Sequence, residues 1–365
     1  MQPTIPICTP PNEPLSESTR RYDIDALRSI ALLLLILYHV AISFQSWAHT
    51  LIFPQHTSSL EGLWKALGIM NVWRIPLLFF ISGMGVYFAI QRRRVPALLK
   101  ERTCRILLPY LFGFFVIAPL QLMMGFAYYN QPIVYIPNAG HLWFLGHIYI
   151  YVTILFPFFF WLKRHENSVF IEKIRSGLQF SPLLLLFSLP VLLGAHGLQP
   201  ESYTRYFDTL HGLVLGFSCF FLGFFLSTLG HPFWQATIQL RWFNLLTGLA
   251  LFFNRLIIYV PKEMEAPDAL NGFETMLWIF ALLGFAAKHL NRPSGFLHYL
   301  SSAVYPVYIL HMPVQFALGI WILPSVPSAW LSFILLLIGT YIGSFLLFEL
   351  LKRIGPIRPL FGMKR

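Results

Sequence analysis

Charged residues are scarce in this chain of 365 residues. Asp, Glu, Lys and Arg together make up 11% of it, whereas an average soluble domain carries roughly 25%. Hydrophobic residues make up 56% and aromatic residues 17%. The scarcity of charge excludes an ordinary soluble domain and predicts an integral membrane protein.

Motifs of soluble enzymes are also missing. The chain has no GxSxG, no P-loop, no dinucleotide-binding glycine fingerprint and no HExxH. Its three cysteines, Cys8, Cys104 and Cys219, stand far apart, so they form no metal-binding motif. We expect neither a metal site nor a permanently bound cofactor.

The apolar runs predict an all-α bundle of ten transmembrane helices, because a bilayer core needs about 20 mostly apolar residues per helix. The predicted spans are 24–46, 68–90, 106–126, 142–162, 180–197, 209–229, 242–260, 271–288, 298–320 and 329–351. We predict a disordered cytoplasmic tail at 1–19, a transmembrane domain at 20–355 and a basic cytoplasmic tail at 356–365.

The basic residues predict the orientation. With ten spans both termini lie on one side, and most of the 26 lysines and arginines fall on that side. The exceptions are Lys65, Arg74, Arg205, Arg255 and Lys262. The positive-inside rule therefore predicts cytoplasmic termini. It also accounts for the net charge of +11, so no nucleic-acid partner is expected.

The first apolar run, RRYDIDALRSIALLLLILYHV (21–41), contains two ionisable residues that a simple anchor does not need. Arg28 and His39 are eleven residues apart, so on a helix they share one face, about 16–17 Å apart along the axis. Ionisable groups inside a span are costly unless paired or hydrated, which makes each a functional candidate. On spacing alone, a snorkelling Arg and a His bonded to a neighbouring helix explain the pair equally well.

A second histidine, His311, is predicted at a similar depth in span nine, between Pro306 and Pro313. Proline frees backbone carbonyls and kinks a helix, which is tolerated where the backbone lines a cavity or packs in protein. His311 is therefore either a catalytic candidate or a hydrogen-bonded residue at a structural kink.

Two arginines open the third span, in KERTCRILLPY (100–110). Arg102 and Arg105 are three residues apart and so share a helix face. Their place beside the apolar run favours a bound anion such as a phosphate. The neighbouring run 92–94 is better explained by topology and anionic lipid headgroups.

Other polar residues lie toward the ends of the spans. Candidate substrate-binding residues at the border of an outer polar vestibule are Arg74, His141, Trp143 and Glu274, although each can also be simply interfacial. Asp25 and Glu349 are structural candidates, and Glu349 is expected to pair with an arginine from another span.

Five segments, in this order, resemble the type 3 family of integral-membrane acyltransferases. They are DxLRxxAxxxxxxYH (25–39), FFISGMGVYF (79–88), RxxR (102–105), YPVYILHMP (305–313) and FELLKRIGPIRPLFGMK (348–364). The last two resemble the branch that contains glucans biosynthesis protein C. The resemblance runs from about residue 20 to the end of the chain.

The resemblance implies a multi-pass protein of the bacterial cytoplasmic membrane. Its donor co-substrate would be acyl-CoA in the cytoplasm, with an acetyl or succinyl group, and its acceptor an extracytoplasmic glycan or glycolipid. By position, His39 would be catalytic, while Arg28, Arg102 and Arg105 would hold the donor. Together with the depth of His311, this gives His39, Arg28 and His311 as the predicted catalytic residues.

One segment departs from the family. Many members carry an acidic residue in a WSLxxE-type segment, where this chain has WFLGHIY (143–149) with His147 and no acid. A transporter or flippase for a small anion or a lipid-linked sugar is the alternative function, since intramembrane His and Arg residues suit it too. The absence of an internal repeat disfavours the inverted-repeat transporter architectures.

Overall fold

A computed structural model describes residues 20–92, 95–200 and 202–363, and these residues are mostly helical, with no strand among them. Ten of their helices are long and apolar enough to cross a membrane. The predicted all-α bundle with ten spans is therefore confirmed. The tail predicted at 1–19 lies outside the described residues.

The helices follow one another with short connections. The first half contains α1 (Tyr22–Ile42), α2 (Glu61–Asn71), α3 (Arg74–Ile90), α4 (Val95–Arg102), α5 (Leu108–Phe112), α6 (Ala118–Tyr128), α7 (Trp143–Arg164) and α8 (Val169–Gly177). The second half contains α9 (Leu189–Leu198), α10 (Leu210–Thr228), α11 (His231–Asn254), α12 (Asp268–His289), α13 (Gly295–Ser325) and α14 (Ala329–Leu351).

Short 3-10 and π turns extend or join these helices. The 3-10 turns are η2 (Ala48–Leu51), η5 (Gly140–Leu142), η6 (Ser181–Ser188), η8 (Val260–Lys262) and η9 (Gly355–Phe361). The π turns are η3 (Thr103–Leu107), η4 (Gly113–Ile117) and η7 (Arg255–Tyr259). Two of the π turns interrupt the span 96–128, and π turns are frequent at functional sites.

The seventh span begins earlier than the sequence suggests. We predicted it at 242–260, but α11 starts at His231 and the span continues to Lys262. Gly230, with a φ of 63°, makes the turn from α10, and Pro232 occupies the first turn of α11. No helix breaker follows before 242. Arg241, assigned from the sequence to a cytoplasmic flank, therefore lies inside a helix.

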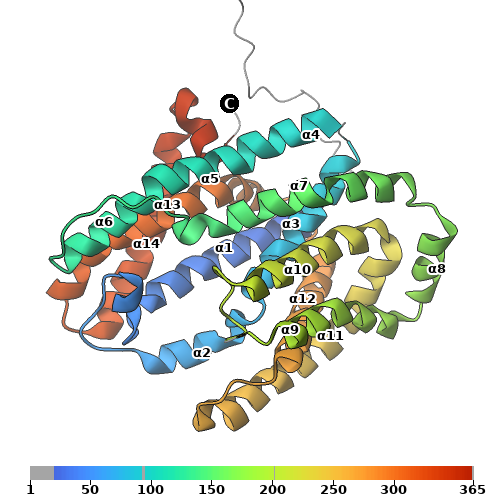
Figure 1. Ribbon diagram of the computed structural model, residues 1–365, viewed down its shortest axis with the longest axis horizontal. Helices are drawn as coiled ribbons and strands as arrows, with labels where there is room; N and C mark the ends of the chain where they lie inside the picture. The colour runs from blue at the N-terminus through green and yellow to red at the C-terminus, as the bar shows by residue number, and fades with distance from the viewer. Residues whose placement is uncertain (1–19, 93–94, 201, 364–365) are drawn as a thin grey trace, which may run out of the picture.

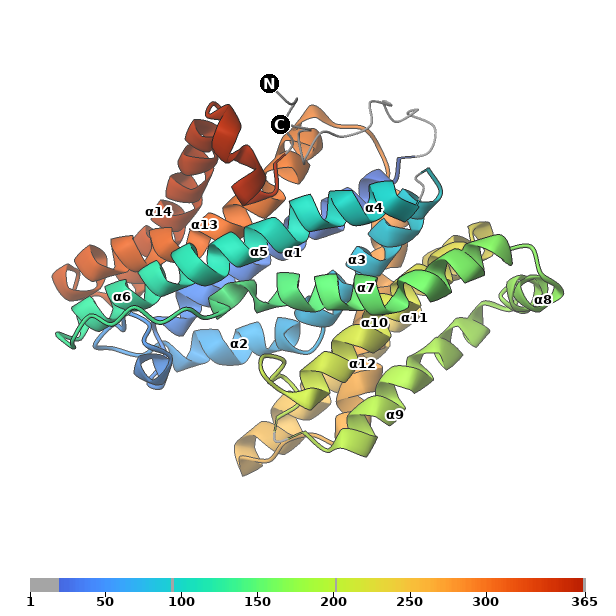
Figure 2. The same ribbon diagram turned by 45° about the horizontal axis from the view of Figure 1, so that its top comes forward.

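Five spans form the interior of the bundle. More than half of the apolar window is buried in each of α1, the α2–α3 span, α10, α12 and α13, whereas only 17% is buried in the span of α11. Figure 1 shows α1 in the middle of the bundle, with α4, α5 and α6 along one edge and α9 and α11 on the opposite side. In both views α8 lies beyond the end of α7 (Figure 2). The two helices that carry Arg28, His39 and His311, α1 and α13, thus belong to the interior of the bundle.

Two glycines let α3 and α10 cross in close contact. A Cβ added to Gly83 would lie 1.9 Å from the carbonyl oxygen of Phe220, and one added to Gly223 would lie 1.9 Å from that of Phe80. Small residues at helix crossings allow such backbone approach in membranes. The glycine of the FFISG segment therefore has a packing role.

The end of the chain folds back onto the bundle. The segment predicted as a basic tail from 356 onward begins with η9, which packs against η3, α5, α13 and α14. Figure 2 draws this red turn above α5. Phe361 is buried, with its ring centroid 5.4 Å from that of Phe112. Residues 355–363 are thus part of the folded domain.

Candidate active site

Two of the predicted catalytic residues meet between α1 and α13. The ring nitrogen Nδ1 of His39 lies 2.8 Å from Nε2 of His311. The two rings are stacked, with centroids 5.1 Å apart and planes 12° from parallel. His311 is fully buried, whereas His39 is partly accessible. Of the pair, only His39 is open to a substrate.

The partners of His311 fix which nitrogen carries each proton. Its Nδ1 lies 2.7 Å from the carbonyl oxygen of Tyr308, which can only accept, so Nδ1–H must donate. The neutral ring then has a bare Nε2, and His39 must donate to it through Nδ1–H. This leaves Nε2 of His39 unprotonated, with a lone pair available for a substrate.

A third histidine joins this cluster. Nε2 of His141 lies 3.1 Å from the same Tyr308 carbonyl, and its ring meets that of His311 edge-on at 5.0 Å. The Tyr308 hydroxyl donates in turn to the His141 carbonyl. His141, predicted to bind substrate, therefore lies beside the predicted catalytic pair and fixes the start of α7 to α13.

Gln315 holds the two helices in register, and sequence reasoning missed it. Its amide nitrogen donates to the His39 carbonyl at 2.9 Å and to the Ser43 hydroxyl at 3.3 Å. It follows His311 by four residues and so shares its helix face. The sequence does contain a signal for Gln315, because it is a polar amide one helical turn after a candidate histidine in an apolar run.

The predicted arginines gather at the other end of α1. Arg102 donates to the Gly85 carbonyl at 3.2 Å, and a Cβ on Gly85 would lie 3.5 Å from Nη2 of Arg28. Arg105 is one turn further on, with Cζ 5.8 Å from the Tyr305 ring centroid. The second glycine of FFISGMG thus lies beside both guanidinium groups.

These arginines are only partly neutralised. Arg28 meets Asp25 at 3.5 Å, and Arg105 meets Glu101 at 3.3 Å. Asp25 also forms an ion pair with Arg20 at 2.8 Å, which fits the structural role predicted for Asp25. The buried Nε atoms of Arg102 and Arg105 have no hydrogen-bond partner among the described residues. Buried charged donors without an acceptor are costly, so this group is suited to a bound anion.

Arg74 occupies the opposite end of α3, beside His39. Its guanidinium carbon lies 3.8 Å from the Tyr38 ring centroid, and the Tyr38 and His39 rings are 6.0 Å apart. Arg74 and Gly85 are eleven residues apart, as are Arg28 and His39. Arg74 and Gly85 of α3 therefore lie beside the two polar parts of α1, Arg74 beside the Tyr38–His39 part and Gly85 beside Arg28.

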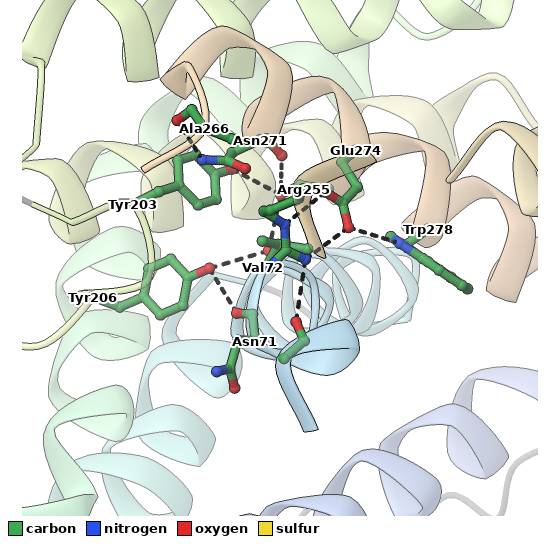
Figure 3. A network of polar contacts seen from close by, with 11 residues as sticks. Asn71, Val72, Tyr203, Tyr206, Arg255, Ala266, Asn271, Glu274 and Trp278 are labelled. Atoms are coloured by element: carbon green, nitrogen blue, oxygen red, sulfur yellow. Dashed lines mark hydrogen bonds and ion pairs between the residues drawn. The ribbon is translucent and has the colours of Figure 1, made fainter. Parts of the chain in front are cut away.

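Glu274, predicted to bind substrate, is engaged by another residue of the chain. Arg255 on η7 donates to both of its carboxylate oxygens, at 3.0 and 3.2 Å, and to the Gly68 carbonyl. Trp278 also approaches Glu274, at 3.4 Å. Figure 3 shows this network joining α12, η7 and the α2–α3 break.

Two tyrosines from the loop before α10 extend this network. Tyr206 donates to the Asn71 and Val72 carbonyls, and the Tyr203 hydroxyl bonds to Thr275. Burial raises the pKa of both phenols, so they stay neutral. The break at Val72 and Trp73, which places Arg74 at the start of α3, is held by these bonds.

Two other predicted residues have partners other than His39, His141 and His311. The Trp143 ring contacts those of His147, at 5.0 Å, and Phe207, at 6.0 Å. Glu349 pairs with Lys352 of its own chain segment at 2.6 Å. The predicted pairing of Glu349 with an arginine from another span is wrong. Lys352 follows Glu349 by one helical turn at the end of α14 and forms the ion pair instead.

No metal site is apparent: the described ranges contain no group of three His, Cys, Asp or Glu side chains placed to hold an ion.

Comparison with known proteins shows the family of the chain. Residues 21–349 match the model of the type 3 acyltransferase family, described as an acyltransferase domain. The chain belongs to this family. Glucans biosynthesis protein C of Escherichia coli strains SMS-3-5 and K12/DH10B is 25% identical over 383 residues, which cover 94% of this chain and 95% of each relative. No solved structure matches.

Family membership confirms the resemblance seen in the sequence. The protein is a multi-pass membrane acyltransferase that transfers groups other than amino-acyl groups. The Arg28–His39 motif lies on one continuous helix, and the RxxR motif runs from the last residue of α4 into a π turn. The family match includes both polar parts of α1, the one with Arg28 and the one with His39.

Proposed function

We propose that this protein transfers an acetyl or succinyl group from cytoplasmic acyl-CoA to a hydroxyl of an extracytoplasmic glycan or glycolipid. The observation that carries the proposal is the hydrogen-bond chain from the Tyr308 carbonyl through His311 to His39. It leaves Nε2 of the partly accessible His39 unprotonated. A sugar hydroxyl is a poor nucleophile and needs such a base.

The arginine end of α1 suits the donor. Arg28, Arg102 and Arg105 offer charged donors to the phosphates of coenzyme A, and the nucleotide need not enter the membrane, where charge is costly. The flexible pantetheine arm then carries the thioester along α1 toward His39, about 16–17 Å away by helix rise. The excess of Lys and Arg on this side supports a cytoplasmic location for the termini.

The transfer balances as a simple displacement. Nε2 of His39 takes the proton of the acceptor hydroxyl while its oxygen attacks the thioester carbonyl carbon. The C–S bond breaks, and the coenzyme A thiolate leaves and recovers the proton from the imidazolium. The same lone pair suits a route through an acyl-histidine intermediate. His311 stabilises the imidazolium in either route, as an orienting partner does in a catalytic triad.

The test is acyl transfer by the purified protein in detergent. Labelled acetyl-CoA and succinyl-CoA are each supplied with a soluble gluco-oligosaccharide, because two relatives are named for glucan biosynthesis, and the product is identified by its mass. We expect one acylated sugar to form, at a rate that is about 10²–10⁴-fold lower in a His39→Ala protein of equal abundance. Transfer by His39→Ala at the normal rate would rule out the catalytic assignment.

The transporter alternative makes a different prediction. A transporter would bind substrate in detergent but leave the acyl–sulfur bond intact. Mass spectrometry of envelope glycans from cells with and without the protein then identifies the natural product. Loss of an acyl mass from one glycan supports the proposal, whereas unchanged glycans contradict it.

A further inference from the structure

Three aromatic side chains gather where α1 ends. Tyr38 comes from α1, Trp47 from the turn that follows and Trp64 from α2. The ring centroids of Tyr38 and Trp64 are 4.9 Å apart, and those of Trp64 and Trp47 are 5.0 Å apart. All three side chains are partly accessible, so this cluster is open to a ligand. Nothing in the catalytic chain of His39 and His311 uses it.

Arg74 borders the same cluster, and two of its three guanidinium nitrogens lack an acceptor among the described residues. Its side chain is only 4% exposed, and its Nε and Nη1 atoms have no hydrogen-bond partner in the ranges that the structure describes. The Tyr38 ring against its face supplies a cation–π contact. The ring lies against the face of the guanidinium and cannot accept the hydrogen bonds that point outward in the guanidinium plane. The N–H groups of Nε and Nη1 therefore need oxygen atoms from elsewhere.

We propose that Tyr38, Trp47, Trp64 and Arg74 form the binding site for a hexose ring of the acceptor. The proposal rests on the acyl transfer proposed above and assigns its acceptor to particular residues. The apolar C–H face of the sugar packs on the aromatic rings, and its oxygens accept from Arg74. Because Tyr38 directly precedes His39, with 6.0 Å between their rings, a bound sugar presents a hydroxyl to the base.

The chemistry of the cluster favours a sugar over two other ligands. A lipid chain would pack on the aromatic rings but leave the Arg74 N–H groups without acceptors. A phosphate would satisfy Arg74, but it gains little from the aromatic faces and prefers several cations, as at the opposite end of α1. A pyranose ring has both an apolar face and oxygens at its rim.

The kinetic test uses the full-length protein in detergent. We expect Trp64→Ala to raise the KM for a soluble gluco-oligosaccharide by about tenfold or more, with the KM for acyl-CoA unchanged. Trp64→Phe keeps a flat apolar face and should recover most of the affinity. The control is Trp321→Ala, because Trp321 lies on α13 and is 75% exposed; its kinetics should match the unaltered protein.

A binding measurement separates this site from the transfer itself. Calorimetric titration with the oligosaccharide should give binding that Trp64→Ala weakens and that sorbitol, an acyclic polyol without a ring face, does not reproduce. Thermal unfolding checks that Trp64→Ala is folded. If binding is lost in Trp64→Ala but no acyl transfer occurs in any form, the proposed reaction fails and the sugar site stands.

Two outcomes would overturn the site. Equal oligosaccharide affinity in the unaltered protein and in Trp64→Ala, with transfer intact, would place the acceptor elsewhere. Equal competition by an alkyl chain with and without a glucose headgroup would show that a lipid tail occupies the aromatic cluster.

Discussion

His39 and His311 are 272 residues apart in the chain, yet Nδ1 of one lies 2.8 Å from Nε2 of the other. The Tyr308 carbonyl accepts from the far side of His311 at 2.7 Å. Because a carbonyl cannot donate, the protons of both rings are assigned by this chain of bonds. We therefore expect His311 to act on the substrate only through His39, as a positioning residue.

The first prediction concerns this pair. His39→Ala should lower the transfer rate by about 10²–10⁴-fold, the usual contribution of a general base. His311→Phe fills the same space but removes the acceptor of the His39 Nδ1–H, so a loss of similar order is expected. His311→Asn offers an amide oxygen to that N–H and should retain more activity than His311→Phe.

The measurement is the initial transfer rate in membranes at matched protein abundance. His298→Ala is the control, since His298 lies at the start of α13 and is exposed. Equal rates for His311→Phe and His311→Asn would mean that the hydrogen bond to His39 has no part in the reaction.

The second prediction concerns the arginine group. Arg102→Ala and Arg105→Ala should each raise the Kd for acyl-CoA by about 10–100-fold, because hydrogen bonds to charged groups contribute roughly 1.5–3 kcal/mol. The rate at saturating donor should change less than the affinity. Calorimetric titration with acyl-CoA in detergent measures the effect, with the exposed Arg92→Ala as control.

The donor itself supplies a second comparison for these variants. Dephospho-coenzyme A thioesters lack one phosphate. If one of these arginines binds that phosphate, its alanine variant and the unaltered protein should bind the dephospho thioester with nearly equal affinity. An unchanged Kd for acyl-CoA in both Arg102→Ala and Arg105→Ala would refute the phosphate assignment.

The sequence predicted the spans well, because runs of about 20 apolar residues are a strong signal. It also placed Arg28 and His39 on one helix face, since that relation depends only on helical periodicity. Contacts between distant segments were not predictable in this way. Three contacts depend on how the helices pack. They are the hydrogen bond between His39 and His311, the hydrogen bond from Arg102 to the Gly85 carbonyl and the ion pair of Arg255 with Glu274. No local pattern encodes these contacts.

The third prediction concerns the crossing of α3 and α10. Gly83→Leu should prevent the helices from approaching, because even a Cβ there would lie 1.9 Å from the Phe220 carbonyl oxygen. Overpacking typically costs about 1–3 kcal/mol, and a backbone clash cannot be relieved by a rotamer change. We expect a lower melting temperature and less protein in the membrane. Gly62→Ala is the control, because no atom lies within 4 Å of its added Cβ. A Gly83→Leu protein with normal melting would contradict the close crossing.

The fourth prediction separates two roles for Glu274. If the carboxylate mainly neutralises Arg255, then Glu274→Gln leaves this cation, whose side chain is 17% exposed, without its partner. The change should destabilise the protein by about 3 kcal/mol, the lower end of the range for a buried pair. The double variant Arg255→Met, Glu274→Met removes both charges and should recover much of this loss, because replacing a buried pair by apolar residues is often neutral. Thermal unfolding of the three proteins in one detergent measures the difference.

Acceptor kinetics of the double variant then test the role predicted from the sequence. A purely structural pair predicts a normal acceptor KM once stability is restored. A substrate-binding Glu274 predicts a stable double variant whose acceptor KM stays raised by about tenfold, the loss of one hydrogen bond to a charged group. The ion pair with Arg255, at 3.0 Å and with Glu274 only 1% exposed, leads us to expect the first result, since both carboxylate oxygens already accept from Arg255.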